Sequence, residues 1–262
     1  MRIICLTEET TETLYAIGAD ELIVGISGFT VRPAIARKTK PKVSTYLDAN
    51  IDEILALKPD LVLAWSDLQA NICAQLIHKG IAVHCFNHRS IDGILEMISM
   101  LGRIVNKSEE AEVYRAFLER KIEEMAEKSS QIITRPRIYF EEWFDPLISG
   151  ISWVSEIVEL CGGIDIFAEH RKHQDAKSRI IEHDDIIIEK NPDIILASWC
   201  GKGVKKERIT SRTGWDAINA VRNNQIFEIK SPIILQPGPA ALTEGMDAVQ
   251  SIIDAWHQNF TK

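Results

Sequence analysis

Two short stretches of this chain repeat nearly the same sequence, KPDLVLAW at residues 58–65 and NPDIILASW at residues 191–199. Each follows an apolar periodic segment, IDEILALK or DDIIIEKN, whose spacing predicts a helix. A Pro-Asp pair then ends the helix, and the apolar run after it predicts a short buried strand. Since Pro59 and Pro192 lie about half the length of the 262-residue chain apart, the repeat predicts two similar lobes.

The beginnings of the two halves also match. RIICL at residues 2–6 and RIYFEEW at residues 137–143 predict strands, and each is followed by a loop and a helix that ends at glycine. Further strands are expected at ELIVGI, GIAVHCF and QIFEIK, most of them followed by helical patterns. This alternation predicts an α/β fold of two Rossmann-like lobes, each a parallel sheet covered by helices on both faces.

The stretch between the halves predicts one long helix. Residues 108–132 contain neither Gly nor Pro, and Ser108 with two glutamates gives an N-cap and an acidic first turn. We therefore expect an N-terminal lobe at residues 1–107, a rigid linker helix at residues 108–132 and a C-terminal lobe at residues 133–262.

Composition narrows the possible partners and locations. The net charge of −8 and the pI of about 5.5 argue against nucleic acid as a partner, and no apolar run is long enough to insert into a membrane. The opening MRIICLTEETTETL does not match a signal peptide. The chain as written is thus expected in the cytoplasm, or in the periplasm or at the cell surface if a leader precedes it. The five cysteines form no CxxC pair.

Several longer motifs resemble the class III substrate-binding proteins of ABC importers, whose two lobes are joined by a helical backbone. The resemblance rests on IDEILALKPDLVLAW, VSEIVELCGG and RIICLTEETTETLYAIG, and it covers nearly the whole chain. YFEEWFDPLISGISWVSE, SWCGKGV and SPIILQPGPAAL are similar to the vitamin B12 (cobalamin) branch of that family.

The resemblance implies a non-catalytic, monomeric protein that binds a corrinoid such as cobalamin in a cleft between the lobes. It implies no covalent cofactor and no resident metal. An ABC permease is the implied partner, docked through acidic residues that match Asp52 and Asp185. Helix N-termini also stabilise carboxylates without any partner, so this simpler role stays open. Ferric-siderophore, haem or metal-ion binding proteins of the same fold are alternatives, as is a two-lobed enzyme, although no GxGxxG, Walker or GxSxG motif occurs.

Ligand-binding candidates follow from the rule that parallel α/β sheets bind ligands beyond the carboxyl ends of their strands. In the first lobe these are Glu8, Phe29, Arg32, Tyr46, Trp65 and His88; in the second they are Glu142, Trp143, Trp199, Cys200, Lys202 and Gln236.

The side chains at these positions suggest a broad, flat ligand. Aromatic rings at strand ends offer faces for stacking, and we expect Trp65, Trp143 and Trp199 to be only partly packed. Trp153 and Trp256, on predicted helices, are expected in the core. Adjacent strand residues point to opposite faces, so at most one of two neighbouring glutamates at residues 141 and 142 would face the ligand unless the strand has ended. A surface ion pair is the alternative.

The histidines and Cys200 give weaker signals. His84 and His88, and His170 and His173, have spacings seen in metal sites, but we expect solvated or hydrogen-bonded imidazoles. Cys200 is a candidate ligand or reactive thiol, and buried structural thiols are the alternative for all five cysteines.

Overall fold

The computed structural model describes residues 1–260 and divides the chain into two units, which are described separately below. The N-terminal unit comprises Met1–His88, Asp92–Leu118 and Pro237–Pro239. The C-terminal unit comprises Arg89–Ile91, Glu119–Gln236 and the chain from Ala240. The lobe boundaries expected at residues 107 and 133 stay a prediction.

The N-terminal unit contains a five-stranded parallel sheet. Its order is β3-β2-β1-β4-β5, with the strands β1 (Ile3–Cys5), β2 (Ile23–Ser27), β3 (Lys42–Ser44), β4 (Leu61–Ala64) and β5 (Ala82–Cys85). Each strand joins the next through a helix, as a parallel sheet requires.

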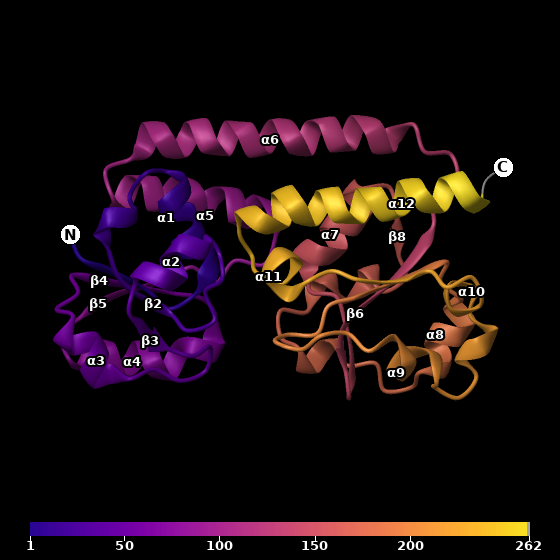
Figure 1. Ribbon diagram of the computed structural model, residues 1–262, viewed down its shortest axis with the longest axis horizontal. Coiled ribbons are helices and arrows are strands. Elements are labelled where there is room, and N and C mark those ends of the chain that lie inside the picture. The colour runs from indigo at the N-terminus through magenta and orange to yellow at the C-terminus, as the bar shows by residue number, and fades with distance from the viewer. Residues whose placement is uncertain (261–262) are drawn as a thin grey trace. The chain divides into compact units, whose positions relative to one another are not determined.

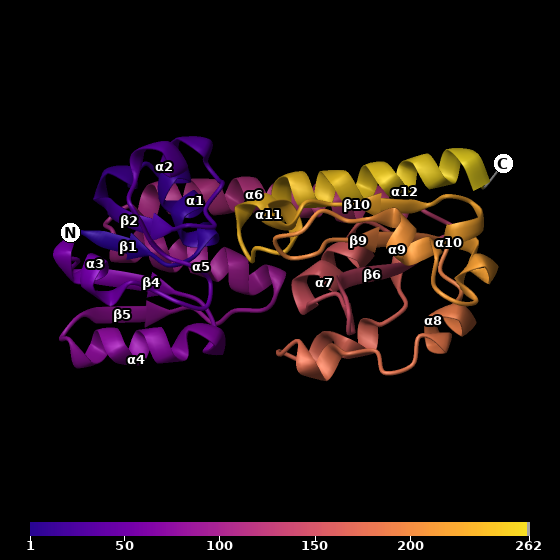
Figure 2. The same cartoon turned by 60° about the horizontal axis from the view of Figure 1, so that its bottom comes forward.

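Five helices cover both faces of this sheet. They are α1 (Glu8–Ala16), α2 (Ala34–Thr39), α3 (Ile51–Ala56), α4 (Ala70–His78) and α5 (Ile91–Ile104). Ile54 of α3 and Leu76 of α4 pack on Ile4 and Val62, while α1 and α5 lie against the opposite face, as Figures 1 and 2 show. Thus two apolar layers sandwich the sheet.

The C-terminal unit is built on a second sheet of order β10-β9-β6-β7, with β8 pairing the start of β6. Its strands are β6 (Arg137–Phe144), β7 (Leu147–Ser149), β8 (Ile164–Asp165), β9 (Ile194–Ala197) and β10 (Ile226–Glu228). β6 runs on past Trp143 and turns at Asp145 and Pro146 into the antiparallel β7. A loop was expected here, so the prediction of a purely parallel second sheet was wrong at this edge.

Helices again pack on both faces of the second sheet. They are α7 (Ser152–Leu160), α8 (Asp185–Lys190), α9 (Lys206–Thr210), α10 (Asn219–Arg222), α11 (Ser231–Ile234) and α12 (Met246–Phe260). One core cluster joins Tyr139 of β6 to Ile187 of α8 and Trp215. Trp153 on α7 is buried and donates its indole N–H to the Ile234 carbonyl (2.9 Å), and Trp256 is buried as well, so both tryptophans expected in the core lie there.

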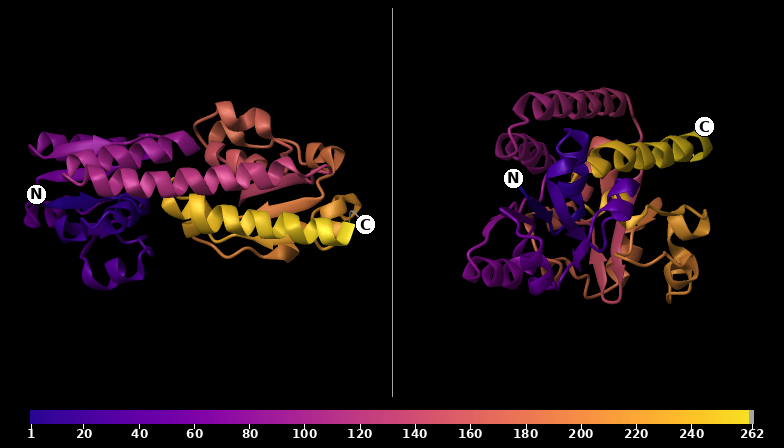
Figure 3. Two further views of the ribbon diagram at one scale, coloured as in Figure 1. Left: turned by 90° about the horizontal axis from the view of Figure 1, so that it is seen from above. Right: turned by 60° about the vertical axis from the view of Figure 1, so that its left-hand side comes forward.

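The predicted linker helix is present as α6 (Ser108–Ser130), which begins in the N-terminal unit and ends in the C-terminal one. Within the C-terminal unit its second half lies beside α12 (Figure 3). Lys121 pairs with Asp247 and Lys128 pairs with Asp254 across the two helices, at 2.7 and 2.6 Å.

The repeated phrase takes the same place in both sheets. β4 and β9 each pair in parallel with the first strand of their unit. The Asp60 carboxylate accepts from the Arg2 backbone N–H at 2.6 Å, and the Asp193 carboxylate accepts from that of Arg137 at 2.9 Å. The aspartate after each proline therefore holds the phrase against the start of the first strand.

The α/β prediction, with two lobes of mostly parallel strands joined by a long helix, is thus confirmed. No helix among residues 1–260 combines the length and the apolar character needed to cross a membrane.

Candidate functional site

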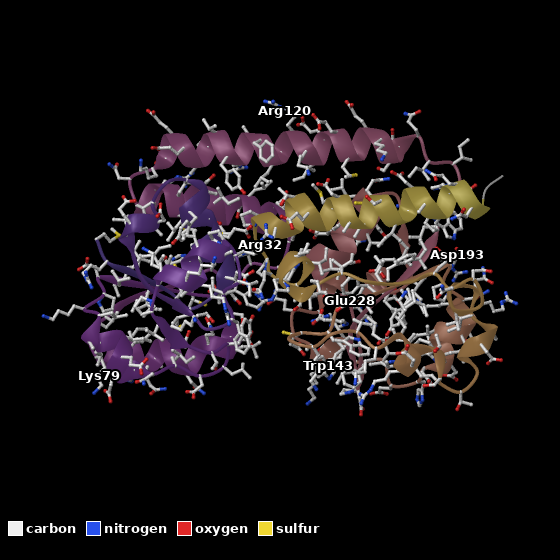
Figure 4. The ribbon with its side chains drawn as sticks, viewed as in Figure 1. Arg32, Lys79, Arg120, Trp143, Asp193 and Glu228 are labelled. Atoms are coloured by element: carbon white, nitrogen blue, oxygen red, sulfur yellow. The ribbon has the colours of Figure 1, made fainter. Side chains whose placement is uncertain are left out.

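Six residues predicted to bind ligand follow strands of the N-terminal sheet at their carboxyl ends. They are Glu8 after β1, Phe29 and Arg32 after β2, Tyr46 after β3, Trp65 after β4 and His88 after β5. Because all five strands are parallel, these ends lie at one edge of the sheet. In Figure 4, Arg32 lies on this side of the unit and Lys79, which precedes β5, lies on the other.

Gln69 ties three of these strand ends together. It is buried, its side-chain oxygen accepts from the Trp65 backbone N–H (2.9 Å), and its side-chain nitrogen donates to the carbonyls of Tyr46 (3.1 Å) and Leu6 (3.3 Å). A neutral amide can satisfy donors and acceptors from three loops at once. No sequence signal pointed to this residue.

Tyr46, Trp65 and His88 form an aromatic group beside Gln69. The ring centroids of Tyr46 and Trp65 are 6.3 Å apart, and those of Trp65 and His88 are 6.5 Å apart. The Trp65 indole N–H donates to the His88 carbonyl at 3.0 Å, and the His88 ring lies 2.7 Å from the Pro237 carbonyl oxygen. The structure therefore brings three of the six predicted residues together.

Two buried carboxyls, Glu8 and Glu9, open α1 at the same edge. Burial raises the pKa of Glu8 to about 8, although its carboxyl accepts from the Val31 backbone N–H at 2.6 Å. Burial also raises the pKa of Glu9 to about 7, against a hydrogen bond from Thr7 that favours the charged form. Gly238 lies directly on Glu9, where an added Cβ would approach the Glu9 Cβ to 2.5 Å. Glu8 as a ligand contact stays a prediction.

The other two N-terminal candidates differ in accessibility. The Phe29 side chain is 56% exposed. The Arg32 guanidinium is paired with Glu12 at 3.0 Å, so its charge is balanced within the unit. Phe29 is therefore the most accessible aromatic among the predicted residues of this unit.

In the C-terminal unit, the two glutamates of β6 are each paired with a different arginine. Glu141 is fully buried and binds Arg212 with both oxygens, at 2.5 and 3.1 Å. Glu142 binds the buried Arg179 at 2.7 and 2.9 Å. The sequence left a surface ion pair open as the alternative; both glutamates are paired, but the pairs are buried, so the expected surface location was wrong. Glu142 as a ligand contact stays a prediction.

The end of β6 and the segment after β9 form a second aromatic group. The Phe144 ring lies 5.0 Å from Trp143 and 4.4 Å from Trp199, measured between centroids. Lys202 places its ammonium 5.0 Å from the centre of the Trp143 ring, within the range of a cation–π contact. Figure 4 shows Trp143 and Glu228 toward one end of this sheet and Asp193, which precedes β9, toward the other.

The expectation that Trp65 and Trp199 are only partly packed was wrong. Trp65 is 5% exposed and Trp199 is 2% exposed. Trp199 belongs to the core cluster of its unit and donates its indole N–H to Glu141 at 3.1 Å. The two are also not equivalent, because Ser198 stands between Ala197 and Trp199 whereas Trp65 directly follows Ala64. One extra residue reverses the face of a strand to which a side chain points.

The remaining candidates lie beside this group or apart from it. Cys200 follows Trp199, and partial burial raises the pKa of its thiol, which disfavours the reactive thiolate. Gln236 is half-buried after α11. Asp52 and Asp185 are exposed in the first turns of α3 and α8, as predicted, and their docking role stays a prediction.

Histidines make hydrogen bonds and ring contacts. His84 lies in β5 with its ring 4.4 Å from Phe86, and burial lowers its pKa. His170 lies 2.8 Å from the Ser149 hydroxyl. Within residues 1–260, no group of three or more His, Cys, Asp or Glu side chains could hold a metal ion.

Surface hollows mark two different regions of the C-terminal unit. A pocket of about 330 Å³ lies at the strand ends, lined by Phe144, Trp199, Lys202, Gly203, Lys205 and Arg208. A larger one, of about 610 Å³, is lined by residues that include Gln131 and Thr134, which precede β6. Ligands of parallel α/β sheets bind beyond the carboxyl ends of strands, so the smaller pocket is the candidate site. Lys205 and Arg208 were missed in the sequence, although the basic run GKGVKK marks their segment.

Comparison with known proteins identifies the family. A family model described as periplasmic binding protein matches residues 3–233. The chain belongs to this family. The resemblance drawn from the sequence motifs is therefore confirmed at the level of the family.

Individual relatives of this periplasmic binding protein are distant. It is 26% identical over 260 residues to the ABC transporter substrate-binding lipoprotein YvrC of Bacillus subtilis, covering 96% of this chain and 79% of that protein. It is 26% identical over 259 residues to the vitamin B12-binding protein of Vibrio cholerae, covering 96% and 87%. The solved haem-binding protein RhuT of Roseiflexus sp. RS-1 shares the fold, with a TM-score of 0.82 at 21% identity over 97% of this chain and 98% of that one.

Proposed function

We propose that this chain is the non-catalytic substrate-binding component of an ABC importer, and that it binds a corrinoid or a related tetrapyrrole. The observation that carries the proposal is the presence of half-buried aromatic rings at the strand ends of each unit: Tyr46 beside the buried Trp65, and Trp143 and Phe144 beside the buried Trp199. A flat macrocycle offers such groups a large face to contact, and polar neighbours orient it.

The names of the relatives support the ligand class. One curated relative is a vitamin B12-binding protein, and one solved structure of the same fold is a haem-binding protein. Both ligands are broad macrocycles that carry a metal ion, which arrives with the ligand and needs no resident metal site. Binding between the two lobes, and docking of a permease at Asp52 and Asp185, are further parts of this proposal.

Direct binding tests the proposal. The purified chain is incubated separately with cyanocobalamin, haemin and a ferric hydroxamate siderophore, and visible absorbance is recorded across a gel-filtration run. We expect a tetrapyrrole to co-elute with the protein in a fixed ratio. Elution of all three compounds apart from the protein would refute the proposal. Co-elution of the siderophore alone would show that the ligand is a ferric siderophore and not a tetrapyrrole.

A variant then tests the aromatic groups. Tyr46 is half-buried beside Trp65, so its ring is accessible enough for a ligand. Tyr46→Ala should weaken binding of the co-eluting tetrapyrrole by about 1–3 kcal/mol with little change in thermal stability. Phe117→Ala, which removes an exposed ring from α6, is the matched control and should leave affinity unchanged. Equal affinities of the two variants would count against stacking on Tyr46.

A further inference from the structure

The pocket at the strand ends of the C-terminal unit, which we call the cationic pocket, is lined by Phe144, Trp199, Lys202, Gly203, Lys205 and Arg208. Its volume of about 330 Å³ is at the lower end of the range for ligand sites. It would hold one part of a macrocycle and not the whole. The question is which chemical group its lining selects.

The charge of this lining is positive and unbalanced. Lys202, Lys205 and Arg208 line the pocket, and no carboxylate does. Among residues 1–260, none of the three forms an ion pair or donates a side-chain hydrogen bond. In a chain of net charge −8, three such cations in one pocket create a local positive potential.

Two nearby arginines of the same unit, unlike the cations of the pocket, are paired with carboxylates. Arg212 and Arg179 are each held by a buried glutamate through two hydrogen bonds. Their charge is neutralised by these glutamates and is not available to a ligand. The cations of the pocket lack such partners, although Arg208 is only four residues before Arg212.

Two of the three cations, Lys202 and Arg208, lie over the ring of Phe144, and this contact does not use up their N–H donors. The Arg208 guanidinium carbon lies 4.7 Å from the centre of the Phe144 ring, and the Lys202 ammonium lies 5.5 Å from it. A cation–π contact engages the charge over the ring face and leaves N–H groups for other acceptors. The pocket thus combines directed N–H donors with aromatic surface.

We propose that the cationic pocket binds the acidic substituent, a carboxylate or a phosphate, of a ligand whose conjugated ring packs against Phe144. This inference rests on the proposed ligand-binding function and specifies the chemistry that the ligand must carry in the C-terminal unit. Charge-assisted hydrogen bonds from Lys and Arg are the strongest available to such oxygens, and Arg matches two of them at once.

Small probes test the pocket independently of any tetrapyrrole. The full chain, labelled with ¹⁵N, is titrated with 1-naphthoate, 1-naphthyl phosphate and the uncharged 1-naphthalenemethanol, and the indole N–H signals of Trp143 and Trp199 are followed. We expect both indole signals to shift with at least one acidic probe. The alcohol should bind at least tenfold more weakly. Whether the carboxylate or the phosphate binds more tightly identifies the acidic group.

Arg208→Gln and Lys206→Gln form a matched pair of variants. Lys206 is adjacent in charge and sequence but places its ammonium over Phe227 at 5.7 Å and does not line the pocket. Arg208→Gln should weaken binding of the acidic probe by about tenfold, the loss of one charge-assisted bond. Lys206→Gln should change it by less than about twofold, and raising the salt concentration should weaken binding to the unmodified chain.

Three results would overturn the inference: equal binding of the alcohol and the acids, equal effects of the two variants, or no shift of either indole signal with any probe. These outcomes are distinct from failure of the proposed function. If no tetrapyrrole co-elutes but the probes discriminate as expected, the pocket is an acid-binding site and the ligand class is different. If cyanocobalamin or haemin binds and Arg208→Gln has no effect on probes, the function stands and this inference falls.

Discussion

Each unit places two neighbouring glutamates near the carboxyl end of its first strand, and the two units balance them differently. In the N-terminal unit, Glu8 and Glu9 are buried, and burial raises the pKa of both carboxyls toward neutrality. In the C-terminal unit, Glu141 and Glu142 each bind an arginine through two hydrogen bonds. Burial therefore favours the protonated carboxyl in the N-terminal unit, whereas an arginine neutralises each carboxylate in the C-terminal unit.

This difference follows from what surrounds each pair. A buried carboxylate is costly unless a positive charge or several hydrogen bonds accompany it, and protonation is the alternative. Arg32, whose charge acts on Glu8, is already paired with Glu12. Near Glu141, by contrast, Arg212 approaches to 2.5 Å. The comparison predicts that the N-terminal unit responds to pH, whereas the C-terminal unit depends on its arginines.

The largest expected effect is that of Arg212→Ala. It would leave Glu141 buried without its partner, and breaking a buried ion pair in this way costs about 3–5 kcal/mol of the free energy of unfolding. Urea denaturation followed by tryptophan fluorescence measures the loss. The double variant Glu141→Leu/Arg212→Met should recover most of it, because no charge is then left buried. An Arg212→Ala variant as stable as the unmodified chain would show that the C-terminal unit does not depend on this arginine to neutralise Glu141.

The next effect is that of pH on the N-terminal unit, tested with Glu9→Gln. The pKa of Glu9 is raised from 4.5 to about 7 in the folded state, so folding retains a proton that the unfolded chain releases. This contribution to stability is fully present below pH 4.5 and is lost as the pH rises through 7. Glu9→Gln should therefore match the unmodified chain at pH 4 and exceed its free energy of unfolding by about 3 kcal/mol at pH 9.

Urea titrations at several pH values check this result. Glu124→Gln, which removes an exposed carboxylate from α6, is the control and should show no comparable gain at pH 9. A Glu9→Gln variant whose stability has the same pH dependence as the unmodified chain would show that Glu9 is not the titrating group.

The smallest expected effect sharpens the contrast between buried and exposed ion pairs. Lys128 is 53% exposed and Asp254 is 40% exposed where they join α6 to α12. Lys128→Gln should lower the free energy of unfolding by only about 0.2–1 kcal/mol, since solvent screens the pair. The same denaturation assay at low and high salt measures it. A loss as large as that of Arg212→Ala would mean that burial does not decide the strength of these pairs.

The repeated phrase shows why the fold could be predicted from the sequence. Its signals are local: an apolar helix stripe, a proline that ends the helix, and an apolar run for the strand. The structure adds that Lys58 and Asn191, which precede the two prolines, both adopt positive φ (48° and 40°), and that the aspartates that follow hold equivalent strand starts. The linker helix could be predicted from equally local signals, because its 23 residues contain neither Gly nor Pro and keep the apolar spacing of a helix.

The candidate site was only partly predictable. The rule that ligand sites follow strand ends placed Tyr46, Trp65 and His88 correctly beside one another. It could not reveal Gln69, whose three hydrogen bonds join loops that are far apart in the sequence. It also could not reveal that β6 continues into a hairpin, because pairing with β7 depends on a partner strand and not on the pattern of β6 alone.

By itself, the sequence determined the two-lobed α/β fold, the long helix and the family, because helix stripes, prolines and apolar strands act over a few residues. Only the tertiary structure decided the state of each charged and aromatic side chain. Trp65 and Trp199 both follow strand ends, yet both are buried by the side chains packed around them. Glu141 is paired and the pKa of Glu9 is raised because of which side chains surround them in space. Charges and rings respond to neighbours brought together by folding, and those neighbours are distant in the sequence.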